Sequence, residues 1–242
     1  MVSRLRSHSV MPRRRRTGIA GIPHHVINRA CRRSVIFGSE QDYRTWENLL
    51  IAATKRYSLR VTDFAVLTNH FHLIVWPEQD LQLSRFMQWL TGTQTQRWHA
   101  AHGTTGTGPL YQGRFKAIPI QSDHHFLTVA RYVARNPVRA LLSRRVEEWR
   151  WSSAWHRCNS SDSFLSDWPI RMPHDWVALA NDPLPDEELA AVREAVALNW
   201  PYGDAEWTRE MAERFAMQRA LRFPGRPRIH PLEPALAFAT VS

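Results

Sequence analysis

The run from Val66 to Trp76 constrains the fold most strongly, because it places two histidines around a phenylalanine in a pattern typical of a β-strand. Side chains of a strand point alternately to its two faces, so we expect His70 and His72 on one face and Phe71 on the other. Two imidazoles on one rigid strand form an edge that can bind a metal ion. An ordinary histidine pair is the alternative, and for an isolated motif of this kind it is the commoner case.

Hydrophobic periodicity and turn residues predict alternating strands and helices along the first two thirds of the chain. Besides the histidine strand, strands are predicted over residues 24–29, 59–67 and 115–120, and helices over residues 39–56, 83–102 and 122–136. The first six elements follow the split βαβ order of ferredoxin-like and RRM-like folds. We therefore expect an α+β fold, with one antiparallel sheet and helices on one face.

Local signals refine these elements. Ser39 and Ser122 are the expected N-caps of the first and third helices, and the third helix should stop before Pro137. Pro119 lacks a backbone N–H, so its strand should lie at a sheet edge or end early. A mainly helical C-terminal extension is expected from two short helices over residues 186–199 and 204–221.

The charge of the chain is uneven. The 242 residues carry a formal net charge of +10, and only Lys55 and Lys116 are lysines. Residues 1–159 hold 24 basic and 9 acidic side chains, whereas residues 160–200 hold 2 basic and 8 acidic ones. Arginine suits phosphate groups, so the first segment is expected to bind a polyanion. An arginine-rich genome is the alternative, but it does not explain the change of sign.

The cysteines and the apolar segments indicate the cellular compartment in which the protein is expected. The two cysteines, Cys31 and Cys158, form neither a disulfide framework nor a zinc-binding spacing. No apolar run reaches the length of a membrane span, and the basic N-terminus lacks the apolar core of a secretory signal. We expect a cytoplasmic, nucleoid-associated protein without membrane contact.

A tyrosine and an asparagine occupy one face of the predicted third helix, because Tyr132 and Asn136 are four residues apart. The Asn136 carboxamide and phosphate oxygens can complete the coordination of a metal at the histidine pair, which favours Mg²⁺ or Mn²⁺. A phenol is a weak nucleophile until it loses its proton, and Arg131 and Arg135 are candidates to favour that loss. A core or surface tyrosine on an amphipathic helix is the alternative.

Residues 108–115 combine glycines with side chains suited to single-stranded nucleic acid. Tyr111 can stack on a base, Gln112 can bond a base edge, and Arg114 can bind a phosphate. A junction between a loop and a strand, with Phe115 in the core, is the alternative.

Two basic segments flank this body. Arg13, Arg14, Arg15 and Arg16 end a polar N-terminal arm. Near the other end, Arg226 stands between glycine and proline, which resembles the core of an AT-hook that lies in a minor groove. A solvated basic tail is the alternative.

Four motifs occur in an order and spacing that resemble the REP-associated tyrosine transposases, relatives of insertion-sequence transposases of the single-tyrosine HUH class. They are residues 69–72, 108–115, 132–140 and 151–154. The resemblance extends over roughly residues 11–228. Tyr111 departs from the tryptophan common in the family, and Leu67-Thr68 departs from a common Met-Pro.

The resemblance implies a role for each motif. His70 and His72 correspond to metal ligands, Asn136 to the third ligand, and Tyr132 to the nucleophile. It also implies a bacterial endonuclease and strand transferase that uses Mg²⁺ or Mn²⁺ on single-stranded DNA beside a REP-type hairpin. The intermediate would be a 5′-phosphotyrosine with a free 3′-hydroxyl, and a monomer is favoured over a homodimer.

Shifts of composition divide the chain into a basic arm at residues 1–17, a body at 18–159, which the resemblance makes a transposase domain, and an extension at 160–242. The residues that we expect to bind DNA are Arg13, Arg14, Arg15, Arg16, Asn28, Arg29, Tyr111, Gln112, Arg114, Arg131, Arg135, Arg139 and Arg226. Two alternatives stay open: a replication initiator or relaxase that nicks DNA by the same chemistry, and a non-catalytic nucleic-acid-binding module.

Overall fold

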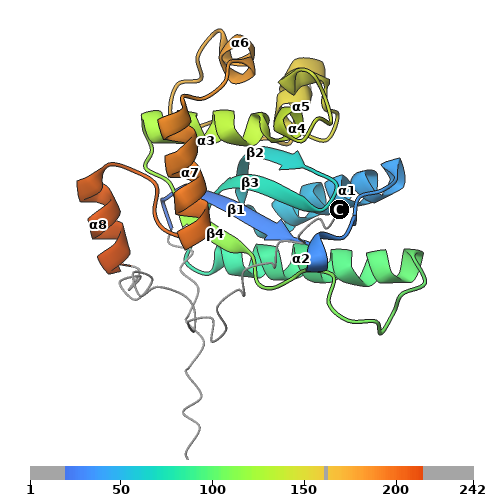
Figure 1. The fold of residues 1–242 in the computed structure, drawn as a ribbon. Coiled ribbons are helices and arrows are strands. Elements are labelled where there is room, and N and C mark those ends of the chain that lie inside the picture. The colour runs from blue at the N-terminus through green and yellow to red at the C-terminus, as the bar shows by residue number, and fades with distance from the viewer. Residues whose placement is uncertain (1–19, 161–162, 215–242) are drawn as a thin grey trace, which may run out of the picture.

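A four-stranded antiparallel sheet forms the centre of the protein, whose computed structural model describes residues 20–160 and 163–214. The strands lie in the order β2-β3-β1-β4 (Figure 1). Their bounds are β1 His24–Arg29, β2 Arg60–Val66, β3 His70–Trp76 and β4 Lys116–Pro119. The expected α+β fold and its antiparallel sheet are confirmed, and Pro119 ends an edge strand. The four N-terminal arginines and Arg226 lie outside the described residues.

Two long helices, α1 (Glu40–Tyr57) and α2 (Gln82–Ala101), belong to the core cluster on one face of the sheet. Ser39 caps α1 as expected, and its side chain and that of Asp42 form a reciprocal capping box. Phe71 of β3 is fully buried on this face. The alternation expected for the histidine strand therefore holds, since its apolar residues supply the main core.

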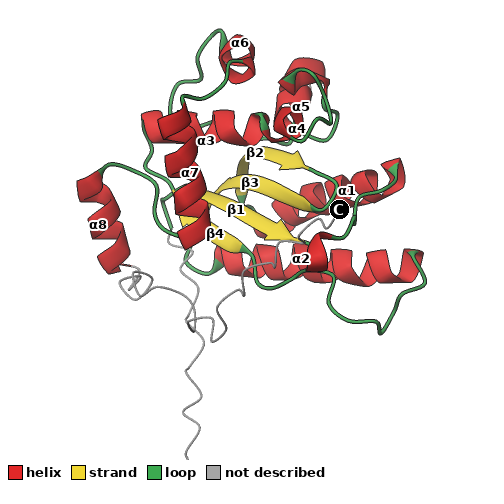
Figure 2. Cartoon of the chain, viewed as in Figure 1, coloured by secondary structure: helices red, strands yellow, loops and turns green. Residues whose placement is uncertain are grey.

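The opposite face is covered as well, by α3 (His124–Ala134) and α7 (Asp186–Leu198) (Figure 2). Both helices follow the split βαβ unit in sequence. The expectation that Ser122 caps α3 is wrong, because the side chain of Asp123 accepts the backbone N–H of His125 at 2.8 Å. The third helix stops before Pro137 as expected, since α3 ends at Ala134, and Pro137 lies instead in the first turn of the short helix α4 (Asn136–Arg139), where a missing N–H costs nothing.

Shorter elements complete the described chain: the 3₁₀-helices η1 (Cys31–Arg33) and η2 (Val146–Glu148), and the helices α5 (Ser153–Asn159), α6 (Trp176–Asn181) and α8 (Ala205–Arg214). The expected helix over 204–221 is confirmed as far as the described residues reach. No helix in the described part of the chain has the length and apolarity needed to cross a bilayer.

A cation fastens α7 to the sheet edge. The ammonium group of Lys116 in β4 donates to the carbonyls of Val196 and Ala197 at 2.6 and 3.0 Å. These carbonyls lie in the last turn of α7, where the helix leaves acceptors unpaired and carries partial negative charge. The extension is thereby packed beside the histidine-bearing face.

Candidate active site

The two histidines of β3 lie side by side on the face covered by α3. Their ring centroids are 5.1 Å apart, with an angle of 71° between the rings. His72 is buried and His70 is partly exposed. In the strand register, Arg29 of β1 lies opposite His70, and Ile27 lies opposite His72. The predicted pairing of the imidazoles on one face is confirmed.

A third histidine, which the sequence analysis did not single out, belongs to this group. His25 of β1 places its Nε2 atom 2.8 Å from Nδ1 of His72, and the two rings stack with centroids 5.1 Å apart. His25 is almost fully buried. Alternation along residues 24–29 would have indicated its face, but only the register between β1 and β3 brings it to His72.

The other histidine is held by an asparagine. Nδ1 of His70 lies 2.7 Å from Oδ1 of Asn69, whose Nδ2 donates to the carbonyl of Arg33 at 3.0 Å. Because the Asn69 oxygen can only accept, Nδ1 of His70 carries the proton. Its Nε2 atom is then left with the lone pair that a metal requires.

Burial keeps these imidazoles neutral. It lowers the pKa of His25 to about 3 and that of His70 to about 4, with smaller contributions from Arg139 and Arg29 respectively. Burial, followed by the neighbouring histidines and arginines, also holds the pKa of His72 well below its ordinary value. Neutral imidazoles retain lone pairs at physiological pH, which is the form that coordinates metals.

Tyr132, near the end of α3, lies against the histidine group. Its ring meets the edges of His72 and His25 with centroid separations of 5.9 and 5.7 Å. The guanidinium carbon of Arg139 lies 4.2 Å from the centre of the tyrosine ring. Tyr132 is only 8 % exposed, so it is enclosed rather than placed at the polar margin of the helix. Two motifs sixty residues apart in sequence therefore form one site.

Asn136 and Arg139 hold the end of the tyrosine helix. Nδ2 of Asn136 donates to the carbonyl of Tyr132 at 3.1 Å, and Nη2 of Arg139 donates to the same carbonyl at 3.0 Å. Nη2 of Arg139 also donates to Oδ1 of Asn136 at 2.9 Å. That oxygen keeps one further lone pair.

Two of the expected DNA contacts have another role. Arg131 donates from Nε to the carbonyl of Leu179 at 3.1 Å, and Arg135 donates to the carbonyl of Asn181. These acceptors lie in the last turn of α6, which attracts cations. The expectation that Arg131 and Arg135 bind phosphate or ionise Tyr132 does not fit these contacts, since their donors anchor the C-terminal extension. By contrast, Arg29 lies opposite His70 in the strand register, and, after burial, its charge contributes to the lowered pKa of His70.

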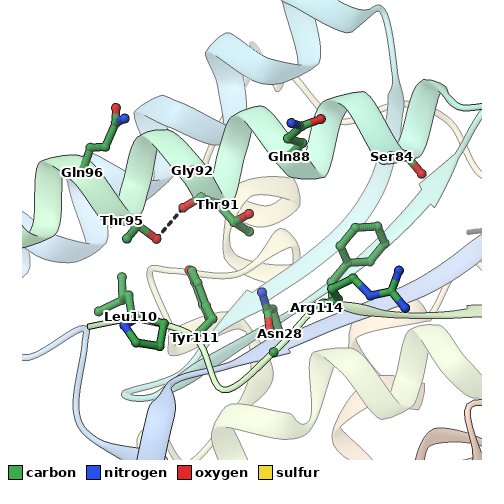
Figure 3. A pocket seen from close by; sticks show the side chains of 13 residues that line it. Asn28, Ser84, Gln88, Thr91, Gly92, Thr95, Gln96, Leu110, Tyr111 and Arg114 are labelled. Carbon is green, nitrogen blue, oxygen red and sulfur yellow. Dashed lines mark hydrogen bonds between the residues drawn. The ribbon is translucent and has the colours of Figure 1, made fainter. Parts of the chain in front are cut away.

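The loop before β4 also departs from expectation. Tyr111 is 8 % exposed, its ring packs on Phe71 in the core, and its hydroxyl donates to Oε1 of Gln94. A ring enclosed in this way has no open face on which a base could stack. Tyr111 nevertheless forms part of a pocket wall together with Asn28 and Arg114 (Figure 3). Three expected DNA contacts therefore meet at one pocket.

A separate group of potential metal ligands lies at the start of α3. Donor atoms of Asp123, His124 and His125 all lie within 4.8 Å of one another. The carboxylate of Asp123 accepts from the backbone N–H that begins the helix, and it lies 2.8 Å from Nδ1 of His125. This group is two turns of helix away from Tyr132, so it is distinct from the β3 histidines.

Comparisons with known proteins agree with this architecture. The profile of the family described as Transposase IS200 like matches residues 19–136. A solved REP-associated tyrosine transposase bound to a REP hairpin is 22 % identical, covers 65 % of this chain and 95 % of its own, and has a TM-score of 0.51. A putative transposase from Deinococcus radiodurans R1 is 16 % identical, covers 50 % of this chain and 95 % of its own, and has a TM-score of 0.36. No curated protein matches the sequence. Over residues 19–136, this chain belongs to the IS200-like transposase family.

Proposed function

We propose that this protein is a metal-dependent nuclease and strand transferase that cuts and rejoins single-stranded, hairpin-bearing DNA. Tyr132 is its nucleophile. The observation that carries the proposal is the packing of the Tyr132 ring against His72 and His25, on the face where His70 also lies.

The donor set suits a divalent metal such as Mg²⁺ or Mn²⁺. His70 and His72 would hold it through their Nε2 atoms, because both Nδ1 atoms already have partners. The remaining lone pair of the Asn136 oxygen makes that residue a candidate third ligand. A bound metal would polarise the scissile phosphate and stabilise the departing 3′-oxygen.

The residues of the chain would carry the covalent step. The Tyr132 hydroxyl gives up its proton to water and attacks phosphorus, which forms a Tyr132 Oη–P bond and breaks the bond between phosphorus and the 3′-oxygen. Arg139, whose guanidinium lies over the tyrosine ring, would place positive charge beside the negatively charged phosphate that is attacked. The bond energy stays in the phosphotyrosine link, so attack by a 3′-hydroxyl restores a phosphodiester without ATP.

His25 would act as a positioning residue for His72. Of the two facing nitrogens, one must donate and the other must accept. If His25 accepts, the proton of His72 stays on Nδ1 and the Nε2 lone pair is available to a metal. His25 thus serves His72 as Asn69 serves His70.

Two observations support hairpin DNA as the substrate and a monomer as the working unit. The solved relative with the same fold is bound to a REP hairpin. Within this chain, α6 and α7 cover α3, with Arg131 bonded to carbonyls at and just after the end of α6. A tyrosine helix covered by its own chain is expected to act in cis.

The test uses one hairpin oligonucleotide with an unpaired extension, labelled at either end, with Mg²⁺ or Mn²⁺. On a denaturing gel, we expect the 3′-terminal label to become attached to protein and the 5′-terminal label to run as a shorter free strand. An adduct that carries the 5′-terminal label would overturn the proposed polarity. Cleavage of both labelled strands without any adduct would overturn the tyrosine mechanism.

A further inference from the structure

Three consecutive residues at the start of α3 form a second group of possible metal ligands, separate from the β3 histidines. Oδ1 of Asp123 lies 2.8 Å from Nδ1 of His125, and Oδ2 of Asp123 lies 3.8 Å from Nδ1 of His124. The rings of the two histidines are close neighbours, with centroids 3.9 Å apart. One donor atom from each of the three residues lies within 4.8 Å of the other two.

Neighbouring contacts hold two members of this group in place. The backbone N–H of His125 donates to Oδ1 of Asp123 at 2.8 Å, which fixes the carboxylate at the first turn of α3. The ring of His125 meets that of Tyr202 edge-on, with centroids 5.3 Å apart, and its side chain is only 14 % exposed. The side chain of His124, by contrast, is 76 % exposed. Two ligands are therefore preorganised, and the third has room to move.

Two further carboxylates lie near this group. Oδ2 of Asp204 accepts from Nε2 of Gln121, two residues before Asp123, at 2.7 Å. Oε2 of Glu188 in α7 accepts from the hydroxyl of Thr128, one turn further along α3, at 3.2 Å. Among the described residues, no arginine or lysine forms an ion pair with any of these three carboxylates. The local charge therefore favours a cation and disfavours a phosphate.

The donor set matches a transition-metal ion of the zinc type. Imidazole nitrogen and carboxylate oxygen are ordinary ligands of Zn²⁺, whereas Mg²⁺ and Ca²⁺ prefer oxygen atoms alone. Bonds of about 2.0–2.2 Å in a tetrahedral Zn²⁺ site place the donor atoms roughly 3.4 Å apart. A rotation of the exposed His124 ring would reach that spacing, and His125 would bind through Nδ1 with its proton on Nε2. Water would fill the fourth position.

We propose that Asp123, His124 and His125 bind Zn²⁺ at a site separate from the candidate active site. The N-terminus of a helix carries partial positive charge, which opposes a cation. That opposition is small at an exposed helix end, and the carboxylate of Asp123 already offsets it. A bound ion would tie the turn after β4 to the first turn of the helix that carries Tyr132, and it would stabilise the folded chain by mass action. The proposal does not depend on the proposed function.

Calorimetric titration of the metal-free full chain with Zn²⁺ tests the site. Because His70 and His72 can also bind Zn²⁺, every protein in the series carries His70→Ala and His72→Ala, and the chain with these two changes alone is the reference. His124→Ala removes one ligand, and Asp123→Asn removes the negative charge of another. Asparagine is as good an N-cap as aspartate, and His124 is exposed, so both variants should keep α3 folded. His174→Ala is the matched control, since His174 is an exposed histidine outside the group.

We expect the reference protein to bind Zn²⁺ at this site. His124→Ala should weaken the binding by about ten-fold or more, and His174→Ala should change it by less than about two-fold. Asp123→Asn should weaken it as well, because a neutral carboxamide is a poorer Zn²⁺ ligand than a carboxylate. Absence of Zn²⁺ binding in the reference protein, or equal affinity in the reference and His124→Ala proteins, overturns the proposal.

Imidazole ¹⁵N spectra of the reference protein locate the ion. Zn²⁺ should shift the ring nitrogens of His124 and His125 and leave those of His174 unchanged. Shifts confined to other histidines would overturn the assignment even if Zn²⁺ binds. Thermal unfolding gives a third measurement, since Zn²⁺ should raise the Tm of the reference protein more than that of His124→Ala. No DNA is present in these experiments, so their failure is separate from a failure of the adduct test.

Discussion

The two faces of the sheet use the same strands for different purposes. On β3, the side chains of Phe71 and Leu73 are fully buried in the core beneath α1 and α2. Their neighbours His70 and His72 face the tyrosine helix and arginines instead. A period of two residues lets one strand support a core and the proposed active site at once.

The comparison shows how the rigidity of one face serves the other. Burial of the β3 phenylalanine against Trp46 and Tyr111 fixes the strand on which the histidines stand. The histidine face is held by specific hydrogen bonds, such as those of His25 and Asn69. Substitutions should therefore separate stability on one face from chemistry on the other.

The largest effect is expected from Tyr132→Phe. Loss of the nucleophilic oxygen should reduce adduct formation by at least about 10³-fold, while the ring still packs on the histidines. Single-turnover gel assays measure the chemistry, and anisotropy should show an almost unchanged affinity for the hairpin. Cleavage at a rate close to that of the parent protein would refute the assignment of Tyr132.

Phe71→Ala should act on stability. Removal of a fully buried phenylalanine should lower the free energy of unfolding by about 3–5 kcal/mol. His70→Ala, which removes a partly exposed ring from the same strand, should cost less than about 1 kcal/mol in metal-free buffer. Urea denaturation measures both free energies of unfolding. Equal losses of stability in the two variants would show that stability does not depend mainly on the core face.

His25 tests the hydrogen bonds of the histidine face. His25→Leu removes the acceptor for Nδ1 of His72, so affinity for Mn²⁺ should fall about 10- to 100-fold. His25→Gln offers an amide oxygen in its place and should recover most of that affinity. Calorimetry measures the binding, and ¹⁵N spectra of the metal-free protein should show His72 protonated on Nδ1 in the parent. Undiminished Mn²⁺ affinity in His25→Leu would make His25 merely structural.

Acid should destabilise the histidine face. Burial lowers the pKa of His25 and His70 from 6.5 to about 3 and about 4, so the unfolded chain binds more protons as pH falls. Stability is retained above pH 6.5 and is lost toward pH 4 for His70 and toward pH 3 for His25. Each group adds up to about 1.4 kcal/mol per pH unit to the slope. Urea denaturation from pH 7 to 4 should show a shallower slope for His25→Gln, and an identical slope would contradict this origin.

The smallest effect distinguishes two arginines. Arg29→Ala should reduce the salt dependence of hairpin binding by close to one released ion, because it would remove the phosphate contact that we propose for Arg29 on the histidine face. Arg131→Ala should leave that slope unchanged, since its guanidinium binds carbonyls at and just after the end of α6. Plots of log Kd against log salt concentration measure both. A reduced slope for Arg131→Ala would show that this side chain does reach DNA.

Local patterns in the sequence were sufficient for most of the fold. The strand bounds, the Ser39 cap and the division of β3 into two faces depend on neighbours within a few residues, so they could be predicted. The prediction that Ser122 caps α3 was wrong because Ser122 and Asp123 are both residue types that favour the N-cap position. Only the path of the backbone selects the aspartate.

The sequence by itself determined which residues we propose for the chemistry: the His70 and His72 pair on one strand face and Tyr132 on a helix. Only the tertiary structure decided what each of them meets. The contact of His25 with His72 depends on strand register, and the use of Arg131 by α6 depends on docking of the extension. Such contacts join residues about fifty positions apart, and their energies depend on the packing of the whole domain rather than on any local pattern.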